Sequence, residues 1–311
     1  MARRRGGPGD PSPAKIIVTA AVLIGLVLVS LRLLPGSPFE SSAAATWGGV
    51  GGGTAITDDG PATRRSRPSP SPSPSPEPLP FVPRDLDLDL DGWYGWSLLD
   101  RRSGEIVGSP DMAETSTTAS MIKAWIVADY LRRTDEAGRK PTEAKLADLT
   151  KIIRDSDNTR TEQLYTEIGR SESIKRLLKT CTLTDSNVAP DKGWSRTALS
   201  PRDTARLGDC IADGKAAGKE WTSWLLKEMR LVRGAGDFGI RKAFPSAERK
   251  TIAIKNGWVD RIREQEIHVN CLAIGDTWTM GVMLRYPIGR GYEYGMDNCR
   301  KVTKALLRSA T

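Results

Sequence analysis

Proline occupies every second position over residues 68–80, mostly in alternation with serine, and this pattern limits how much of the chain can fold. Together with the glycine-rich run 48–53, it lies in a stretch, residues 35–84, that has too few apolar side chains to offset the conformational entropy lost on folding. Alternating proline favours a stiff polyproline II spacer, and glycine favours a flexible one. The sequence therefore predicts a tether over residues 35–84 and one folded domain over residues 85–311.

The first 34 residues have the pattern of a membrane-insertion signal. A basic segment, residues 1–15, precedes an apolar run, residues 16–34. Because positively charged flanks stay on the cytoplasmic side, we expect a single-pass signal anchor in the cell membrane, with the folded domain outside the cytoplasm. A cleaved signal peptide, which would make the protein secreted, is the alternative, since Ala43–Ala45 offers a small-residue cleavage site. Both interpretations export the domain.

The folded part has strand-like runs at both ends and helical patterns between them. The strand-like runs cover residues 93–99, 105–107, 250–255, 267–274 and 277–286. The helical patterns cover residues 120–133, 145–154, 162–168, 171–179, 201–213 and 220–230, and a last helix covers residues 298–307. This arrangement predicts an α+β fold in which both ends of the domain form one antiparallel sheet beside a mainly helical lobe.

Charge and cysteine content exclude some partners and ligands. The net charge is +8, but no basic stripe with interleaved aromatic residues occurs, so we expect no nucleic-acid partner. The four cysteines include no C-x-x-C pair and the one histidine is His268, so we expect neither a metal site nor a cofactor. An even number of cysteines in an exported domain favours disulfides. Three connectivities are possible, and we expect Cys181–Cys210 and Cys271–Cys299.

Three short strings carry the candidate catalytic residues. Residues 120–123 are Ser-Met-Ile-Lys, residues 156–158 are Ser-Asp-Asn and residues 255–257 are Lys-Asn-Gly. They fit S-x-x-K, S-D-N and a variant of K-T-G, a set that brings a serine nucleophile, its base and an anion-binding lysine into one acyl-transfer site. Singly, each string also has a structural interpretation, as a helix N-cap, a second N-cap and a polar turn. Their joint occurrence in this order favours the catalytic interpretation.

Ser120 and Lys123 are the predicted nucleophile and base. They lie three residues apart in a helix that is apolar nearly all round, so their side chains share a face and the lysine is desolvated. Desolvation and a nearby Lys255 both lower the pKa of the Lys123 amine, and a neutral amine can accept the serine proton. Ser156 would then pass a proton to the leaving nitrogen.

The other motif residues are predicted to bind substrate. Asn158 would bind a substrate amide, Lys255 would attract a substrate carboxylate, and Gly257 would let substrate backbone lie against the strand edge. The backbone N–H groups of Ser120 and Trp258 would form the oxyanion hole for the developing negative charge.

With these motifs, residues 92–311 resemble the serine β-lactamase and penicillin-binding protein superfamily, and most of all class A β-lactamase-like domains. The phrase Thr197–Asp203 resembles the end of that family's omega loop. The resemblance implies a serine hydrolase without a cofactor, which we expect to be a monomer that acts on peptidoglycan stem peptides as a D-alanyl-D-alanine-type peptidase. Two alternatives stay open: a β-lactamase, and a catalytically weak protein that binds β-lactams or muropeptides.

Two departures from that family affect the expected chemistry. Asn256, which we also predict to bind substrate, replaces a threonine whose hydroxyl helps to hold the substrate carboxylate. No glutamate lies between Thr184 and Pro201, where class A enzymes have the one that activates the deacylating water. Glutamates of the earlier helices, Glu162 among them, are interpreted as poor substitutes. The sequence therefore predicts slow release of a β-lactam adduct.

Two further features are interpreted as structural. Residues 234–239 match G-x-G-x-x-G, but they follow a helix instead of a strand, so we predict a tight glycine loop and no dinucleotide site. His268 lies alone in a predicted strand and is expected to have no catalytic role.

Overall fold

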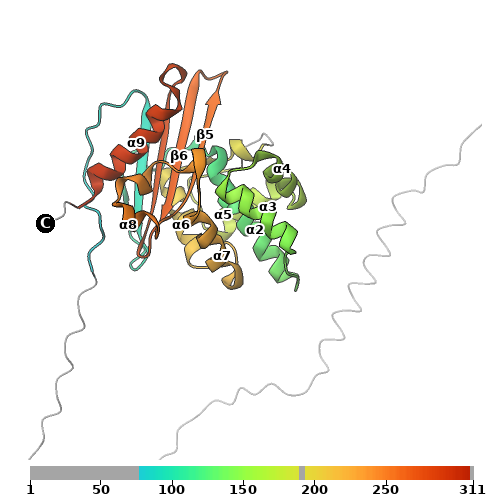
Figure 1. Ribbon diagram of the computed structural model, residues 1–311. Helices are drawn as coiled ribbons and strands as arrows, with labels where there is room; N and C mark the ends of the chain where they lie inside the picture. The colour runs from blue at the N-terminus through green and yellow to red at the C-terminus, as the bar shows by residue number, and fades with distance from the viewer. Residues whose placement is uncertain (1–76, 189–192, 309–311) are drawn as a thin grey trace, which may run out of the picture. The chain divides into compact units, whose positions relative to one another are not determined.

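Five antiparallel strands form the central sheet of the computed structural model, which describes residues 77–188 and 193–308. The N-terminal part of the domain provides β1 (Trp93–Asp100) and β2 (Ile106–Gly108). The C-terminal part provides β5 (Ala253–Arg261), β6 (Glu266–Ile274) and β7 (Trp278–Pro287). The order is β2-β1-β7-β6-β5, so the two ends of the domain pair through β1 and β7 (Figure 1). The predicted α+β fold is thereby confirmed.

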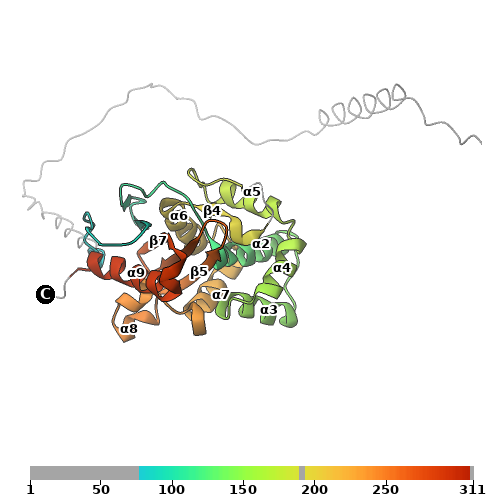
Figure 2. The ribbon, with the colours of Figure 1, turned by 90° about the horizontal axis from the view of Figure 1, so that it is seen from above.

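Helices cover both faces of the sheet, because β6 and β7 bury side chains on each face. On one face α6 (Pro201–Ala212) packs against β1, β6 and β7, and on the other α9 (Gly291–Leu306) packs against β6 and β7 (Figures 1 and 2). Neighbouring residues of β6 illustrate the alternation expected of a strand. Leu272 approaches α6 at Gly208, whereas Cys271 is bonded to Cys299 of α9.

The helical lobe is built around α2 (Lys123–Glu136), which follows the short 3₁₀ helix η2 (Ala119–Ile122). Most residues of α2 are buried, as expected of a helix that is apolar nearly all round. The helices packed against it are α3 (Glu143–Arg154), α4 (Asn158–Glu167), α5 (Ser171–Thr180) and α7 (Lys219–Arg230). The lobe lies beside the edge strand β5, which contacts both η2 and α7 (Figure 1). The sheet edge and the start of the central helix therefore meet.

Short elements complete the domain. The strands β3 (Ser116–Thr117) and β4 (Ala198–Leu199) pair with each other, apart from the main sheet. Short helical turns are α8 (Ser246–Arg249), η3 (Trp194–Arg196), η4 (Gly234–Gly236), η5 (Ile240–Ala243) and η6 (Ile288–Arg290).

Two disulfides join the domain where the sequence predicts them. Cys181, at the end of α5, is bonded to Cys210 of α6, and Cys271 of β6 is bonded to Cys299 of α9. No other cysteine exists in the chain. The first bond links the helical lobe to a helix on the sheet, and the second fixes the C-terminal helix to the sheet.

The folded unit begins before residue 85, which corrects the predicted boundary. Phe81 is only 2% exposed and packs edge-on against Phe244 and Trp278, at ring-centroid distances of 5.8 and 4.9 Å. The backbone N–H of Val82 donates to the carbonyl of Leu306, 2.8 Å away. A single phenylalanine after a proline-rich stretch has no periodicity, so its place in the core cannot be recognised from the local sequence pattern.

The predicted cytoplasmic segment 1–15, the predicted anchor 16–34 and most of the predicted tether lie outside the described residues. In the part of the chain that the structure describes, no helix has the length and apolar character needed to cross a bilayer.

Candidate active site

A cleft of about 410 Å³ opens between the helical lobe and the edge strand β5. It is lined by Ala119, Ser120, Asn158, Thr159, Glu162, Trp194, Ser195, Trp258 and Val259. These residues come from η2, α4, η3 and β5, so the cleft lies where the two parts of the fold meet. Three of the predicted site residues, Ser120, Asn158 and Trp258, are in its wall.

Ser120 lies in η2, directly before the central helix α2 begins at Lys123. The preceding residue, Ala119, has a φ of 47°, in the left-handed region that a residue with a side chain rarely adopts. Ser120 itself is partly exposed and lines the cleft, whereas Lys123 is fully buried behind it. The turn therefore presents the serine to the cleft and keeps the lysine away from solvent.

Lys123 is held by polar atoms of the loop before α4. Its Nζ donates to the carbonyl of Ser156 at 2.6 Å, to Ser156 Oγ at 3.1 Å and to Asn158 Oδ1 at 2.6 Å. Burial lowers the pKa of Lys123 to about 7, against a smaller opposing effect of the negative charge on Asp157. The ring of Trp194 covers the amine, with Nζ 4.7 Å from the ring centroid. A substantial neutral fraction near pH 7 makes Lys123 suitable as a general base.

The hydroxyl of Ser156 joins the two lysines. Its Oγ is 3.1 Å from Lys123 Nζ and 3.0 Å from Lys255 Nζ. The φ of Ser156, 59°, is in the left-handed region, which indicates local backbone strain at this residue. The next residue, Asp157, caps α4 by accepting from the backbone N–H of Arg160. The S-D-N string is thus both a helix cap and part of the lysine network.

Lys255 is fully buried in β5. Burial lowers the pKa of its amine well below the ordinary value, and the positive charge of Lys123 acts in the same direction. Its Nζ donates to Ser156 Oγ and, at 3.4 Å, to the carbonyl of Asn256. The three predicted motif residues Lys123, Ser156 and Lys255 are therefore brought together.

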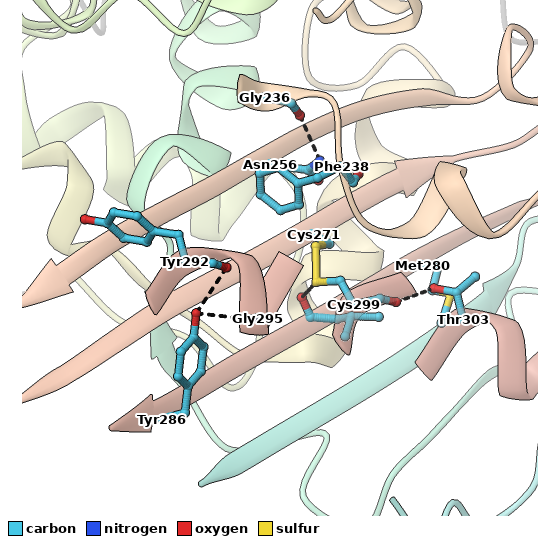
Figure 3. Close-up of a disulfide and its surroundings, with 11 residues drawn as sticks. Gly236, Phe238, Asn256, Cys271, Met280, Tyr286, Tyr292, Gly295, Cys299 and Thr303 are labelled. Carbon is cyan, nitrogen blue, oxygen red and sulfur yellow. Dashed lines mark hydrogen bonds between the residues drawn. A yellow bond between two sulfur atoms is a disulfide. The ribbon is translucent and has the colours of Figure 1, made fainter. Parts of the chain in front are cut away.

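Asn256 does not belong to the cleft, which corrects its predicted role. Its Nδ2 donates to the carbonyls of Gly236 and Phe238, at 3.0 and 2.9 Å, and Figure 3 shows the side chain directed at that loop. The reason is that Lys255, Asn256 and Gly257 lie inside β5 and not in a turn at its end. Successive side chains of a strand point to opposite faces, so if Lys255 faces the site, Asn256 faces away.

A close approach of protein backbone requires glycine at position 257, whereas the predicted contact of Gly257 with substrate backbone stays a prediction. A Cβ at this position would lie 2.3 Å from the carbonyl oxygen of Thr118 and 2.6 Å from the backbone nitrogen of Ser120. The glycine thus lets β5 pack directly against the nucleophile turn. The backbone nitrogen of Ser120 thus lies beside Gly257, the residue before Trp258, and an oxyanion hole formed by the N–H groups of Ser120 and Trp258 stays a prediction.

In the stretch that resembles an omega loop, the described carboxylates accept hydrogen bonds from residues of the same stretch and of α6. Asp185 accepts from Arg202 at 2.6 Å and from Ser200 at 2.7 Å, and Asp203 accepts from the backbone N–H groups of residues 184–186. Asp191, the other acidic residue of this stretch, lies outside the described residues. Among the described residues, the acidic side chain that lines the cleft is that of Glu162, on α4.

Glu162 is the site residue that the sequence interpretation set aside. It is four residues after Asn158, so that both side chains lie on the same face of α4 and both line the cleft. The spacing of four residues is a signal in the sequence for a site residue, because a side chain one helical turn from Asn158 lies in the same surroundings as that asparagine.

The two features interpreted as structural have structural contacts. His268 Nδ1 is 2.8 Å from Thr117 Oγ1 and its Nε2 is 3.2 Å from Glu266 Oε2, so it connects β6 to the neighbouring β3. The glycine loop packs on a disulfide, since a Cβ on Gly239 would lie 2.6 Å from Cys271 Sγ. Across residues 77–188 and 193–308, no group of three or more His, Cys, Asp or Glu side chains is arranged to hold a metal ion.

Comparisons with known proteins agree with this fold. The model of the beta-lactamase enzyme family matches residues 140–308, which is just over half of the chain. The matched residues include Ser156 and Lys255 but begin after Ser120, so the structure, and not this match, connects Ser120 to them. No curated protein matches the sequence significantly.

Solved structures of class A β-lactamases share the fold at low sequence identity. The class A β-lactamase from Mycobacterium abscessus is 17% identical, with a TM-score of 0.54 over 70% of this chain and 93% of that one. The TLA-1 extended-spectrum β-lactamase is 14% identical, with a TM-score of 0.58 over 69% and 92%. A β-lactamase from Burkholderia vietnamiensis is 17% identical, with a TM-score of 0.54 over 69% and 89%.

Proposed function

The chain is a serine hydrolase of the beta-lactamase enzyme family, and we propose that it acts through an acyl-enzyme formed on Ser120. The observation that carries this proposal is the hydroxyl of Ser156, which lies 3.1 and 3.0 Å from the amines of the buried Lys123 and Lys255. Such a bridge can move a proton between two amines beside a serine that lines an open cleft. A merely structural N-cap would not require two buried lysines.

In the proposed acylation, neutral Lys123 accepts the hydroxyl proton of Ser120 while Ser120 Oγ attacks the substrate carbonyl carbon. The oxyanion receives hydrogen bonds from the backbone N–H groups of Ser120 and Trp258. Ser156 then donates a proton to the departing nitrogen and is reprotonated from the adjacent amines. The C–N bond of the substrate breaks, and its acyl group stays on Ser120.

The proposed substrate is an amide that lies close to a carboxylate, since Lys255 in its protonated form would attract an anion to this end of the cleft while Lys123 acts as the neutral base. Peptidoglycan stem peptides of the D-alanyl-D-alanine type are the proposed natural substrate. This choice is supported by the sequence signals for export and for a tether, which would keep the enzyme near the cell wall. The proposal requires no cofactor.

Hydrolysis of β-lactam antibiotics is the second candidate function. Two observations favour it: a carboxylate, that of Glu162, lines the cleft, and the similar solved structures include several class A β-lactamases. A β-lactam also combines an amide with a nearby carboxylate, so the same residues would act on both substrates.

Product assays with the full-length chain separate these functions. We expect release of D-alanine from a diacetyl-Lys-D-Ala-D-Ala peptide, and loss of this activity in Ser120→Ala. Rapid turnover of a chromogenic cephalosporin without D-alanine release would favour the β-lactamase function instead. A chain that binds penicillin but turns over neither substrate would contradict both and indicate a binding protein.

A further inference from the structure

A carboxylate lies in the wall of the cleft that Ser120 also lines. Glu162 lines the same cleft as Ser120 and Asn158, and its side chain is 49% exposed, so water can reach it. Among the described residues no other Asp or Glu is in this lining. The carboxylates of the loop that resembles an omega loop, as far as it is described, are bound to their own loop and to α6.

The two oxygens of Glu162 have different partners, which fix the carboxylate in place. Oε1 accepts from Arg170 at 2.6 Å, and Oε2 accepts from the indole N–H of Trp194 at 3.1 Å. The ring of Trp194 in turn lies over the amine of Lys123. Each carboxylate oxygen can accept more than one hydrogen bond, so Glu162 can still accept one from a water molecule in the cleft.

We infer that Glu162 is the general base that activates water for hydrolysis of the Ser120 acyl-enzyme. Glu162 accepts a proton from water while the water oxygen attacks the acyl carbonyl carbon. The tetrahedral intermediate then collapses: the bond from carbon to Ser120 Oγ breaks, the proton returns to Oγ, and a carboxylic acid is released. This inference rests on the proposed function, and it makes the chain a hydrolase that does not require a glutamate in the omega loop.

A different role for Glu162 predicts different kinetics. If Glu162 only holds Trp194 over Lys123, its loss would slow acylation and leave hydrolysis of the adduct unchanged. The substitution Glu162→Gln separates the two roles, because an amide oxygen can still accept from the Trp194 N–H whereas the amide is a poor base. Trp194→Phe makes the complementary change: it removes the N–H and keeps the carboxylate.

A matched control lies on the same helix. Glu167 is 47% exposed and forms one ion pair, with Lys145 at 2.8 Å, but it is not in the cleft lining. Glu167→Gln therefore makes the same chemical change as Glu162→Gln at a similarly exposed position of α4, without altering the cleft.

The experiment follows nitrocefin by rapid mixing and the Ser120 adduct of benzylpenicillin by intact mass, with the full-length chain. We expect wild type and Glu167→Gln to turn over steadily. We expect Glu162→Gln to open one equivalent of nitrocefin at the wild-type rate and then to slow by about 10²- to 10⁴-fold, with a persistent adduct on Ser120 in the benzylpenicillin experiment.

Three results would overturn the inference. The first is an adduct on Glu162→Gln that is released at the wild-type rate, which would leave Lys123 as the base of both steps. The second is slower acylation of Glu162→Gln with unchanged release of its adduct, which would leave Glu162 a positioning residue. The third is a permanent adduct on wild type. Absence of any adduct on both wild type and Glu162→Gln, together with absence of turnover, would contradict the proposed function itself.

Discussion

Lys123 illustrates how single residues determine the chemistry of this site. An amine that is removed from solvent loses much of its affinity for a proton, and burial lowers the pKa of Lys123 to about 7. The sequence predicts this environment, because the residues around Lys123 are apolar on nearly every side of the helix. It does not predict the partner that covers the amine, Trp194, because that contact joins segments 71 residues apart and has no local pattern.

The first prediction concerns the pH dependence of acylation. The lowered pKa of Lys123, about 7, means that its neutral, proton-accepting form increases as the pH rises through this value. The acylation rate constant should therefore rise about tenfold per pH unit below pH 6.5 and level off above about pH 8. Stopped-flow acylation by a reporter β-lactam between pH 5 and 9 measures it. A rate that stays constant or falls from pH 6 to 8 would show that Lys123 is not the base.

At the scale of elements, the strand β5 determines which motif residues can reach the substrate. The sequence predicts a strand that ends at Lys-Asn-Gly, with a polar turn as the structural alternative for these three residues. The structure continues β5 to Arg261, paired with β6 throughout. Non-local pairing of this kind overrides local propensity. The same limitation explains α9, which starts at Gly291 although its first turns contain two glycines and two tyrosines.

The second prediction tests the orientation of Asn256. Asn256→Thr restores the residue type of the family motif, but the new hydroxyl would face the loop at Gly236 and Phe238 and leave their carbonyls without the amide donor. We expect no gain in acylation rate and a loss of about 1–3 kcal/mol in the free energy of unfolding. Urea unfolding and stopped-flow acylation of the same variant check both. Faster acylation with unchanged stability would place this side chain in the cleft.

At the scale of the whole molecule, the folded unit includes residues that precede the predicted domain boundary. Residues 81 and 82 pair with the end of α9, so the chain enters and leaves the domain at neighbouring points. Composition predicts a tether before a folded domain, but it cannot locate the first core residue. The sheet built from both ends and both disulfide pairs could be predicted, because strand periodicity and cysteine positions are features of the sequence itself.

The third prediction concerns this N-terminal boundary. Phe81→Ala should lower the free energy of unfolding by about 3–5 kcal/mol, because it leaves a cavity against Phe244 and Trp278. Val82→Ala is the matched control, since Val82 is 38% exposed and its replacement should change stability by no more than about 0.5 kcal/mol. Denaturant unfolding of the full-length chain compares them. Equal stability of the two variants would place the boundary after Phe81.

The fourth prediction concerns the proposed anchor over residues 16–34. With the basic flank inside, protease added to intact spheroplasts should cut the chain between residues 48 and 67 and release a fragment that retains the hydrolase domain. Full protection of the chain in intact spheroplasts, with cleavage only after lysis, would contradict this orientation. A chain found in the medium without added protease would favour cleavage after Ala43–Ala45.

The central claim is that Ser120 is acylated with the help of Lys123, and mapping of the covalent adduct tests it most directly. The full-length chain is exposed to benzylpenicillin at pH 8, digested and analysed by mass spectrometry. In samples quenched with acid during turnover, we predict at most one penicilloyl group per chain, located on the peptide that contains Ser120, with no adduct in Ser120→Ala and strongly slowed labelling in Lys123→Met. An adduct on another residue, or labelling of Ser120→Ala equal to that of wild type, would contradict it.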